Sequence, residues 1–329
     1  MTKSNGFNCI QMINGSKLLK YSRIEMAKLE DNDLLIQVEY SCYNYKDYLV
    51  YEGKEGTRRS YPHTLGIDAA GTVVESKCIN FKTGDQVAVM ATRMGLSFAG
   101  GFSEYVSVPA TKVIKIPTYL TARDVMLFGT AGLTAALVIS KLVPGLSNCD
   151  VKPILVTGGS GGVGIISAII LKLNGYEVAV STNNSMARSF LKGIGITHFI
   201  DRISADKSDR FSLLPERWSA CVDVVGGAGL DLVIKSMAQE GKIFNVGSVA
   251  SQKVNMNLTP LYLRGISLVG INTETLEAAA REELIGKFLK KDVILNISEA
   301  CSEHKLQEIP NMFLNSFFSE NFGRHLFKI

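Results

Sequence analysis

A glycine-rich stretch is the part of the sequence whose spacing points most directly to chemistry. Gly159, Gly161 and Gly164 have the spacing Gly-x-Gly-x-x-Gly, between an apolar strand over 153–157 and a helical stretch over 163–174. Glycine suits such a turn because the backbone bends tightly and approaches a pyrophosphate closely. The helix start adds unpaired N–H groups and a positive dipole end. The stretch predicts a dinucleotide site formed by Gly159, Ser160, Gly161, Gly162, Val163 and Gly164.

The segment after the next strand bears on the choice between NAD and NADP. An acidic residue there would bind the adenosine ribose hydroxyls and repel a 2′-phosphate. The chain has no acid at this place, because the strand over 177–181 ends in Ser181, Thr182, Asn183 and Asn184. Small polar donors suit a phosphate, and Arg188 and Arg202 could add charge-assisted hydrogen bonds. We therefore expect NADP(H); Arg188 is more simply explained as a surface charge of a helix.

The elements around the glycine-rich turn alternate between buried strands and helices. Strands are predicted over 153–157, 177–181, 198–200, 220–225, 242–246 and 267–271, with helices over 163–174, 185–192 and 230–238. This alternation predicts a doubly wound parallel sheet, an α/β fold of the Rossmann type, because parallel strands need crossover connections.

The regions on either side of the α/β part have a different pattern. Short strands rich in Val and Ile over 34–40, 71–75 and 85–90 predict a small antiparallel β-barrel. A helix over 274–290 and a strand-like tail over 324–329 follow the α/β part. We therefore expect three segments: a catalytic barrel domain over 1–121, a cofactor domain over 122–272, and a return to the barrel domain over 273–329.

Composition and charge exclude several classes of protein. The 329 residues are 46% hydrophobic with a net charge of +4 and no block of like charges, which argues against a nucleic-acid partner. The most apolar stretches, such as 165–173, are shorter than the roughly 18 residues of a membrane span. The 6 cysteines form no Cys-x-x-Cys pair, and the 4 histidines show no metal-ligand spacing. We expect a cytoplasmic enzyme that acts on a small molecule without a metal.

Several motifs outside the glycine-rich turn resemble one family. They lie at 44–47 (NYKD), 66–68 (GID), 129–135 (GTAGLTA), 223–226 (DVVG) and 323–329. Together they resemble the zinc-free quinone-oxidoreductase branch of the medium-chain dehydrogenases/reductases, and specifically its YhdH/AcuI-type group of acrylyl-CoA reductases. Zinc-dependent members have a cysteine where this chain has Asn44 and a histidine where it has Ile67. Neither replacement is a usual zinc ligand, so we expect no catalytic zinc.

The resemblance implies a GroES-like barrel beside a Rossmann domain, and a reduction that uses NADPH. Hydride would add to the β-carbon of an α,β-unsaturated carbonyl, such as an acrylyl-CoA-like enoyl thioester or an enone, and leave an enolate. Conjugation carries the negative charge to oxygen, which makes a Lewis acid dispensable. Two alternatives remain open: a broad-specificity quinone reductase, and a non-catalytic NADPH-binding or redox-sensing protein.

The resemblance also implies roles for residues of the barrel domain. Asn44 would lie beside the nicotinamide ribose, while Tyr45 or Tyr48 would donate toward the enolate or line the pocket. Asp68 would lie at the cleft, with a structural or a catalytic role. Lys46 and Asp47 would form a local ion pair.

Further residues are predicted to contact the cofactor. Thr130 and Thr134 would bind it or cap a helix, and the strand over 267–271 would lie at a sheet edge where a homodimer can form. The other predicted cofactor contacts are Val246, Gly247 and Ser248 after one strand, Ile271 and Asn272 after the last, and Arg324 near the phosphates.

Overall fold

A computed structural model describes residues 6–14, 17–25, 29–54, 60–143, 152–201, 211–315 and 322–329. The contacts divide the chain into two units: unit 1 comprises Met1–Leu133 and Thr273–Ile329, and unit 2 comprises Thr134–Asn272. The first boundary therefore lies later than the expected end of the barrel domain at residue 121. It falls inside helix α2 (Ala122–Leu142), whose first turns belong to unit 1.

Unit 2 is built on a six-stranded sheet, and the predicted α/β fold is confirmed. The strand order is β11 (His198–Ile200), β10 (Val178–Ser181), β9 (Ile154–Thr157), β12 (Trp218–Asp223), β13 (Met237–Asn245) and β14 (Ser267–Gly270). All neighbouring pairs are parallel. Numbered along the chain, this order is 3-2-1-4-5-6, the order of a Rossmann fold.

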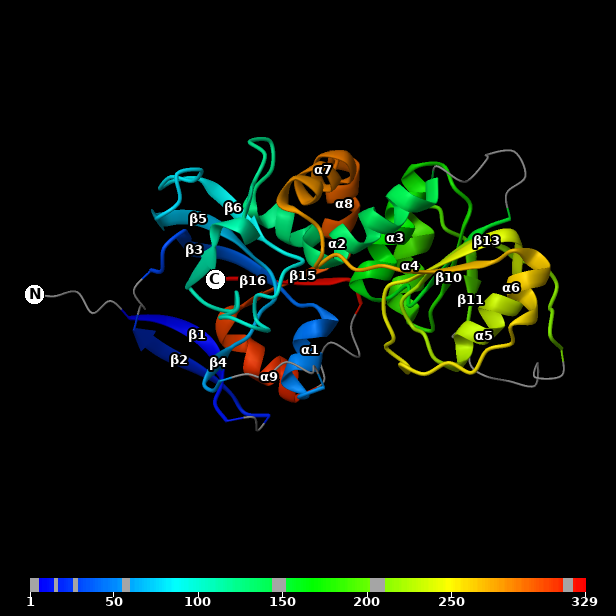
Figure 1. Cartoon of the computed structure of the whole chain (residues 1–329), viewed down its shortest axis with the longest axis horizontal. Coiled ribbons are helices and arrows are strands. Elements are labelled where there is room, and N and C mark those ends of the chain that lie inside the picture. The colour runs from blue at the N-terminus through cyan, green and yellow to red at the C-terminus, as the bar shows by residue number, and fades with distance from the viewer. Residues whose placement is uncertain are drawn as a thin grey trace, which may run out of the picture. The chain divides into compact units, whose positions relative to one another are not determined.

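Helices cover both faces of this sheet. Helices α3 (Gly162–Leu173) and α4 (Ser185–Gly193) lie on one face, and α5 (Ala228–Lys235) and α6 (Thr259–Arg264) lie on the other (Figure 1). The strand β9 is buried along its whole length, which explains its apolar sequence. Helix α5 ends earlier than the predicted 230–238, because Met237 is already the first residue of β13.

Unit 1 contains the β-rich part of the chain. A three-stranded sheet has the order β2 (Leu19–Glu25), β1 (Gly6–Met12) and β4 (His63–Thr64). A seven-stranded sheet has the order β15 (Cys301–Lys305), β16 (Arg324–Lys328), β3 (Asp33–Cys42), β5 (Ala69–Ser76), β6 (Gln86–Val89) and β8 (Ile114–Lys115), with β7 (Tyr105–Pro109) also paired to β3. The described pairs are antiparallel except for β15 with β16.

The C-terminal segment completes unit 1, as β15 and β16 join the sheet that β3 begins. It also supplies helices α7 (Ala278–Phe288), α8 (Lys291–Glu299) and α9 (Ile309–Leu314). Helix α7 is shorter than the predicted 274–290. Two short 3-10 helices, η1 (Ala110–Lys112) and η4 (Leu306–Glu308), connect elements of this unit.

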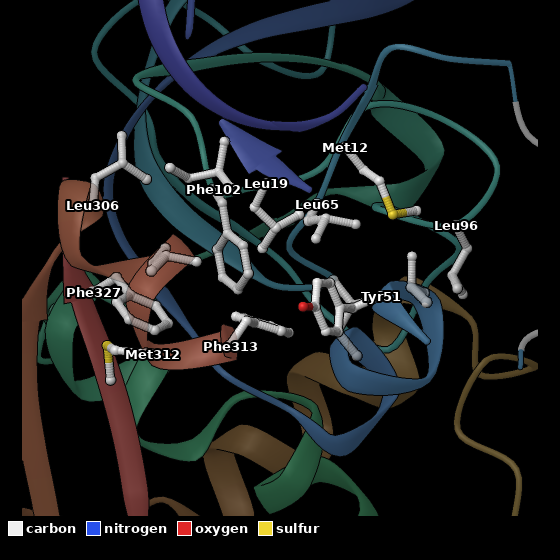
Figure 2. Close-up of a cluster of buried hydrophobic side chains, with 14 residues drawn as sticks. Met12, Leu19, Tyr51, Leu65, Leu96, Phe102, Leu306, Met312, Phe313 and Phe327 are labelled. Atoms are coloured by element: carbon white, nitrogen blue, oxygen red, sulfur yellow. The ribbon is translucent and has the colours of Figure 1, made fainter. Parts of the chain in front are cut away.

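Helix α1 (Tyr45–Tyr51) is anchored in the core of unit 1. Val50 and Tyr51 are buried, and the Tyr51 ring meets the Phe313 ring of α9 edge-on at 5.1 Å between centroids (Figure 2). Buried aromatic pairs of this kind stabilise by more than their area alone. The core thus fixes the orientation of the helix that begins just after Asn44.

The long apolar helix α2 contains a break at Gly129. Among the described helices it alone has the length and apolarity of a membrane span, although the sequence predicted no apolar stretch of that length. Of its most apolar 18 residues, 72% are buried inside the protein. Gly129 has φ 55° and ψ −161°, so two shorter helices meet there. This positive φ favours glycine. The burial of α2 and its break at Gly129 are features of a helix in a protein core.

Candidate active site

The glycine-rich turn between β9 and α3 leaves no room for side chains at two of its glycines. A Cβ atom on Gly159 would lie 2.0 Å from Val180 Cγ1, and one on Gly164 would lie 2.3 Å from the carbonyl oxygen of Gly158. Helix α3 begins at Gly162, so its first N–H groups have no partner within the helix. Such a turn fits a pyrophosphate, because bare backbone and a helix N-terminus are what anions bind in this fold.

Parallel strands bring the predicted adenosine-side residues to the same sheet edge as this turn. Gly159 donates its backbone N–H to the carbonyl of Ser181 at 3.2 Å. Several of the polar side chains are occupied locally: Ser181 Oγ donates to the Asp201 carbonyl at 3.1 Å, and Asn184 Oδ1 accepts from the Ala187 N–H at 2.9 Å. Asn183 is exposed. Arg202 lies outside the described residues.

Arg188 is a residue at this edge that sequence reasoning set aside. Its Nε donates to the Thr182 carbonyl at 2.8 Å, and its Nη2 lies 2.7 Å from Asp201 Oδ1. The guanidinium therefore lies at the end of β10. The available signal was its position four residues after the helix-capping Asn184, one turn into α4.

The late strands end at the same sheet edge. Val246 donates its N–H to the Asp223 carbonyl at 2.9 Å, and Ile271 donates to the Asn245 carbonyl at 3.0 Å. The Asp223 carboxylate, 1% exposed, accepts from Thr157 Oγ1 at 2.8 Å and from Asn245 Nδ2 at 2.9 Å. This carboxylate joins the ends of β9, β12 and β13, a role that the sequence motif around Asp223 did not reveal. Val246, Gly247, Ser248 and Ile271 are half-buried, and Asn272 is exposed.

In unit 1 a buried carboxylate collects hydrogen bonds from distant parts of the chain. Asp68 is 0% exposed. Its Oδ2 accepts from the Thr130 N–H at 2.8 Å and from Asn44 Nδ2 at 2.9 Å, and Thr130 Oγ1 donates to its Oδ1. Cys42 Sγ lies 3.3 Å from the same carboxylate. Asp68 is a predicted catalytic or structural residue, and in the structure its buried carboxylate bonds to Asn44 and Thr130.

The network around Asp68 orients the amide of Asn44. The amide nitrogen Nδ2 donates to Asp68 Oδ2 at 2.9 Å and faces the Cys42 carbonyl at 3.4 Å. Both N–H bonds are thereby directed into the protein, so Oδ1 is the atom with which Asn44 can accept a further hydrogen bond. The residue Asn44 is 8% exposed.

Asp47 holds the backbone on both sides of this network. Its Oδ2 accepts from the Asn44 N–H at 2.8 Å and its Oδ1 from the Ile67 N–H at 2.9 Å. Burial raises the pKa of Asp47 to about 8, against the lowering effect of these two N–H donors. The predicted Lys46–Asp47 pair is wrong, because Lys46 Nζ instead forms an ion pair with Glu274 Oε1.

Arg324 is in the interior of unit 1, 2% exposed. Its Nε donates to the Leu127 carbonyl at 3.0 Å, its Nη1 to the Tyr43 carbonyl at 3.1 Å, and its Nη2 lies 2.9 Å from Cys42 Sγ. These bonds direct the guanidinium into the protein. The expectation that Arg324 reaches cofactor phosphates does not fit this geometry, and we assign it to holding the loop after β3.

The two tyrosines of α1 remain accessible. Tyr45 is 40% exposed, Tyr48 is half-buried, and their ring centroids lie 5.9 Å apart. Thr130 is half-buried, and its hydroxyl donates to Asp68 and accepts from the Ala91 N–H, so it links these two segments. Thr134 lies in unit 2 and is 8% exposed. Within the described ranges, no group of three or more His, Cys, Asp or Glu side chains is placed to hold a metal ion.

Comparisons with known proteins agree with both units. The alcohol dehydrogenase GroES-like domain matches residues 30–118, and the zinc-binding dehydrogenase domain matches residues 162–289. The putative quinone oxidoreductase YhfP of Bacillus subtilis is 35% identical over 309 residues, which are 93% of each protein. The chain belongs to the medium-chain dehydrogenase/reductase family. It is therefore an oxidoreductase of this family, and the predicted resemblance to the YhdH/AcuI-type branch is confirmed.

Other members of this family are similarly close. The acrylyl-CoA reductase AcuI of Ruegeria pomeroyi is 35% identical over 260 residues, 79% of each protein. The yhdH oxidoreductase of Salmonella enterica, solved in complex with NADP, has a TM-score of 0.87 and 27% identity, with 98% of this chain and 99% of that chain covered. YhfP, solved with NAD bound, has a TM-score of 0.88 and 34% identity, with 99% and 100% covered.

Proposed function

We propose that this dehydrogenase/reductase uses NADPH to reduce a carbon–carbon double bond conjugated to a carbonyl, in an enoyl thioester such as acrylyl-CoA or in an enone. One observation supports this reaction above the others. The positions that hold a cysteine and a histidine in zinc-dependent members hold Asn44 and Ile67 here, and Asn44 is tied by its amide to the buried Asp68. An amide and an isoleucine are unsuited to binding zinc, but an amide suits a neutral hydrogen-bonding site.

A conjugated substrate needs little Lewis acidity from the protein. When bound, NADPH supplies a hydride, which is added to the β-carbon of the substrate. The substrate oxygen then takes up the negative charge and requires hydrogen-bond donors rather than a metal. A proton from water or a nearby phenol, added at the α-carbon, completes the reduction. The Tyr45 and Tyr48 hydroxyls, on the accessible side of α1, are our candidates for donating to that oxygen or for lining the pocket.

Asn44 has a different role in this proposal. Its N–H groups face Asp68 and Cys42, so it can only accept a hydrogen bond through Oδ1. An acceptor is of no use to an enolate oxygen, but it can bind a ribose hydroxyl. We therefore assign Asn44 to orienting the nicotinamide ribose, with Asp68 as the positioning residue behind it.

The remaining cofactor contacts are proposed at the carboxyl edge of the sheet in unit 2. The glycine-rich turn would hold the pyrophosphate, Ser181 to Asn184 the adenosine ribose, and Thr134 and the segments at 246–248 and 271–272 the nicotinamide half. The structural relatives support a nicotinamide dinucleotide, since yhdH is titled with NADP and YhfP with NAD.

A second candidate function is a quinone reductase, favoured by the putative quinone oxidoreductase YhfP at 35% identity. The test is to measure NADPH oxidation with acrylyl-CoA, crotonyl-CoA and simple quinones. Turnover of the enoyl thioesters supports the first proposal and turnover of quinones alone supports the second. NADPH binding without turnover of any of them would instead indicate a non-catalytic NADPH-binding or redox-sensing protein.

We also propose a cytoplasmic homodimer. The strand β14 lies at the sheet edge, and its Leu268 is 42% exposed, next to α6 with Tyr262 at 71%. An exposed strand edge favours pairing with a second copy. The five cysteines in the described part of the chain are free thiols, as in a reducing compartment. Light scattering of the purified protein measures the mass and would contradict the dimer if a monomer mass is found.

A further inference from the structure

An acidic residue at the end of β11 lies close to the end of β10, although the segment after β10 itself contains no acid. Asp201 directly follows β11, and β11 is paired in parallel with β10, so Asp201 lies beside Thr182 at the carboxyl edge. The Thr182 N–H donates to the Ile200 carbonyl at 3.2 Å, which ties the two strand ends together. The absence of an acid after β10 is therefore compensated by an acid after its neighbour.

This carboxylate is paired with the arginine that reaches back from α4. Arg188 Nη2 lies 2.7 Å from Asp201 Oδ1, and the guanidinium is also held by the carbonyls of Thr182 at 2.8 Å and Ile200 at 3.3 Å. The guanidinium also lies over the Phe199 ring, with its carbon 5.8 Å from the ring centroid. The cation is thus fixed by several contacts at the strand ends, whereas among the described residues the Asp201 carboxylate has one contact, the pair with Arg188.

The Asp201 side chain is also much more exposed to solvent than the Arg188 side chain. The Asp201 side chain is 88% exposed and that of Arg188 is 31% exposed. An ion pair this exposed contributes little, so its carboxylate is easily displaced by a stronger anion. A phosphate dianion offers three acceptor oxygens and more charge than a carboxylate. Arg188 is consequently available to a phosphate, but only in competition with Asp201.

We propose that Arg188 and Asp201 together set the choice between NADPH and NADH: Arg188 binds the adenosine 2′-phosphate of NADPH, and Asp201 weakens that binding by pairing with Arg188. This inference rests on the proposed function insofar as it takes a nicotinamide dinucleotide as the cofactor. Its consequence is that the enzyme accepts both cofactors with a small preference. With NADH, which lacks the 2′-phosphate, the ion pair stays intact.

The test is to measure dissociation constants of NADPH and NADH by calorimetry on the full chain and its variants, with no substrate present. Arg188→Met keeps an unbranched apolar stem and removes the donors. It should weaken NADPH by about tenfold or more, because charge-assisted hydrogen bonds are lost, and change NADH less than about twofold. Asp201→Asn should tighten NADPH by about fivefold and leave NADH unchanged.

Two matched variants separate this pairing from a general effect of charge. Lys192 lies over the same Phe199 ring, at 6.0 Å, without an ion pair to Asp201, so Lys192→Met removes an equal charge from the same helix and should weaken NADPH by less than about threefold. Glu177→Gln removes an exposed negative charge at the opposite end of β10 and should leave both constants unchanged. The double variant Arg188→Met with Asp201→Asn should show no gain over Arg188→Met.

The outcomes distinguish this inference from the proposed function. Equal weakening of both cofactors by Arg188→Met, or an Asp201→Asn gain that persists without Arg188, overturns the pairing and leaves the reductase proposal standing. Failure of the unmodified chain to bind either dinucleotide overturns both. Binding of adenosine 2′,5′-diphosphate, compared with adenosine 5′-phosphate, gives a readout without the nicotinamide ring and should show the same order of effects.

Discussion

The glycine-rich turn of unit 2 and the polar cluster around Asp68 in unit 1 use opposite means to prepare a binding site. In the turn, glycines leave the backbone bare, so that N–H groups and a helix end are open to a ligand. In the cluster, Asp68 and Arg324 are buried side chains that hold other residues in place. A backbone site can be lost through one added methyl group, whereas a side-chain network fails when its central acceptor is removed.

The largest effect is expected from removing that acceptor. Asp68→Ala leaves the Thr130 N–H and the Asn44 amide without their buried partner. We expect a loss of about 3–5 kcal/mol in the free energy of unfolding, the range found when one partner of a buried network is removed. Urea unfolding measures it. Asp68→Asn, which keeps one acceptor oxygen, should lose less; an Asp68→Ala loss below about 1 kcal/mol would contradict the network.

A smaller effect, on binding more than on folding, is expected from the turn. A Cβ on Gly161 meets only the Gly158 carbonyl oxygen at 3.7 Å, and the φ of −89° suits alanine. Gly161→Ala should therefore cost less than about 1 kcal/mol in stability. We expect about tenfold weaker dinucleotide binding, since the methyl group occupies the approach of the pyrophosphate. Calorimetric titration checks this.

A control for the turn is available in the same unit. Gly193, at the end of α4, has open space around a Cβ. Gly193→Ala should leave dinucleotide binding unchanged. If Gly161→Ala also binds with the affinity of the unmodified chain, the phosphates do not lie against this turn.

The same contrast explains what the sequence could reveal. The turn was predictable because all of its parts are consecutive in the chain, from the strand through Gly159 to α3. The Asp68 cluster draws on β3, the start of β5, the break in α2 and β16, and nothing in the spacing of Cys42, Asp68, Thr130 and Arg324 indicates that they meet. A family motif can mark such residues as important, but their burial decides whether they act on a ligand or on each other.

Asp201 illustrates the same limit within unit 2. The sequence motif places the discriminating acid at the end of β10, because a linear motif describes one strand end. The pairing of β10 with β11 is a property of the sheet, and it brings Asp201 and Arg188 together across 13 positions. Neighbouring strand ends thus bring together residues, here Arg188 and Asp201, that no single segment of the chain contains.

The pH dependence of folding should reveal the buried carboxylate beside the cluster. The pKa of Asp47 is raised from 3.8 to about 8, mainly by burial, with the Asp68 carboxylate raising it and Arg324 lowering it. The folded state therefore binds a proton that the unfolded state has released above pH 4. Its stabilising contribution is complete below about pH 4 and is lost as the pH rises through about 8.

Asp47→Asn tests this titration, because an amide resembles the protonated carboxyl group. The free energy of unfolding of the unmodified chain should fall relative to the variant by about 1 kcal/mol between pH 7 and pH 9, where the buried carboxyl group loses its proton. Urea unfolding at both pH values measures the difference. An identical pH slope in the two proteins would show that Asp47 does not titrate in this range.

The smallest effect is expected from the ion pairs at Glu274. Lys46 and Arg93 both pair with this carboxylate, but their side chains are 34% and 48% exposed, against 22% for Glu274. Water and salt screen such pairs, and Arg93 remains when Lys46 is replaced. Lys46→Met should change the free energy of unfolding by less than about 0.5 kcal/mol. In the structure Asp47, and not Lys46, is bonded to the segments around Asp68. A loss above about 1 kcal/mol would mean that Lys46 also supports this network.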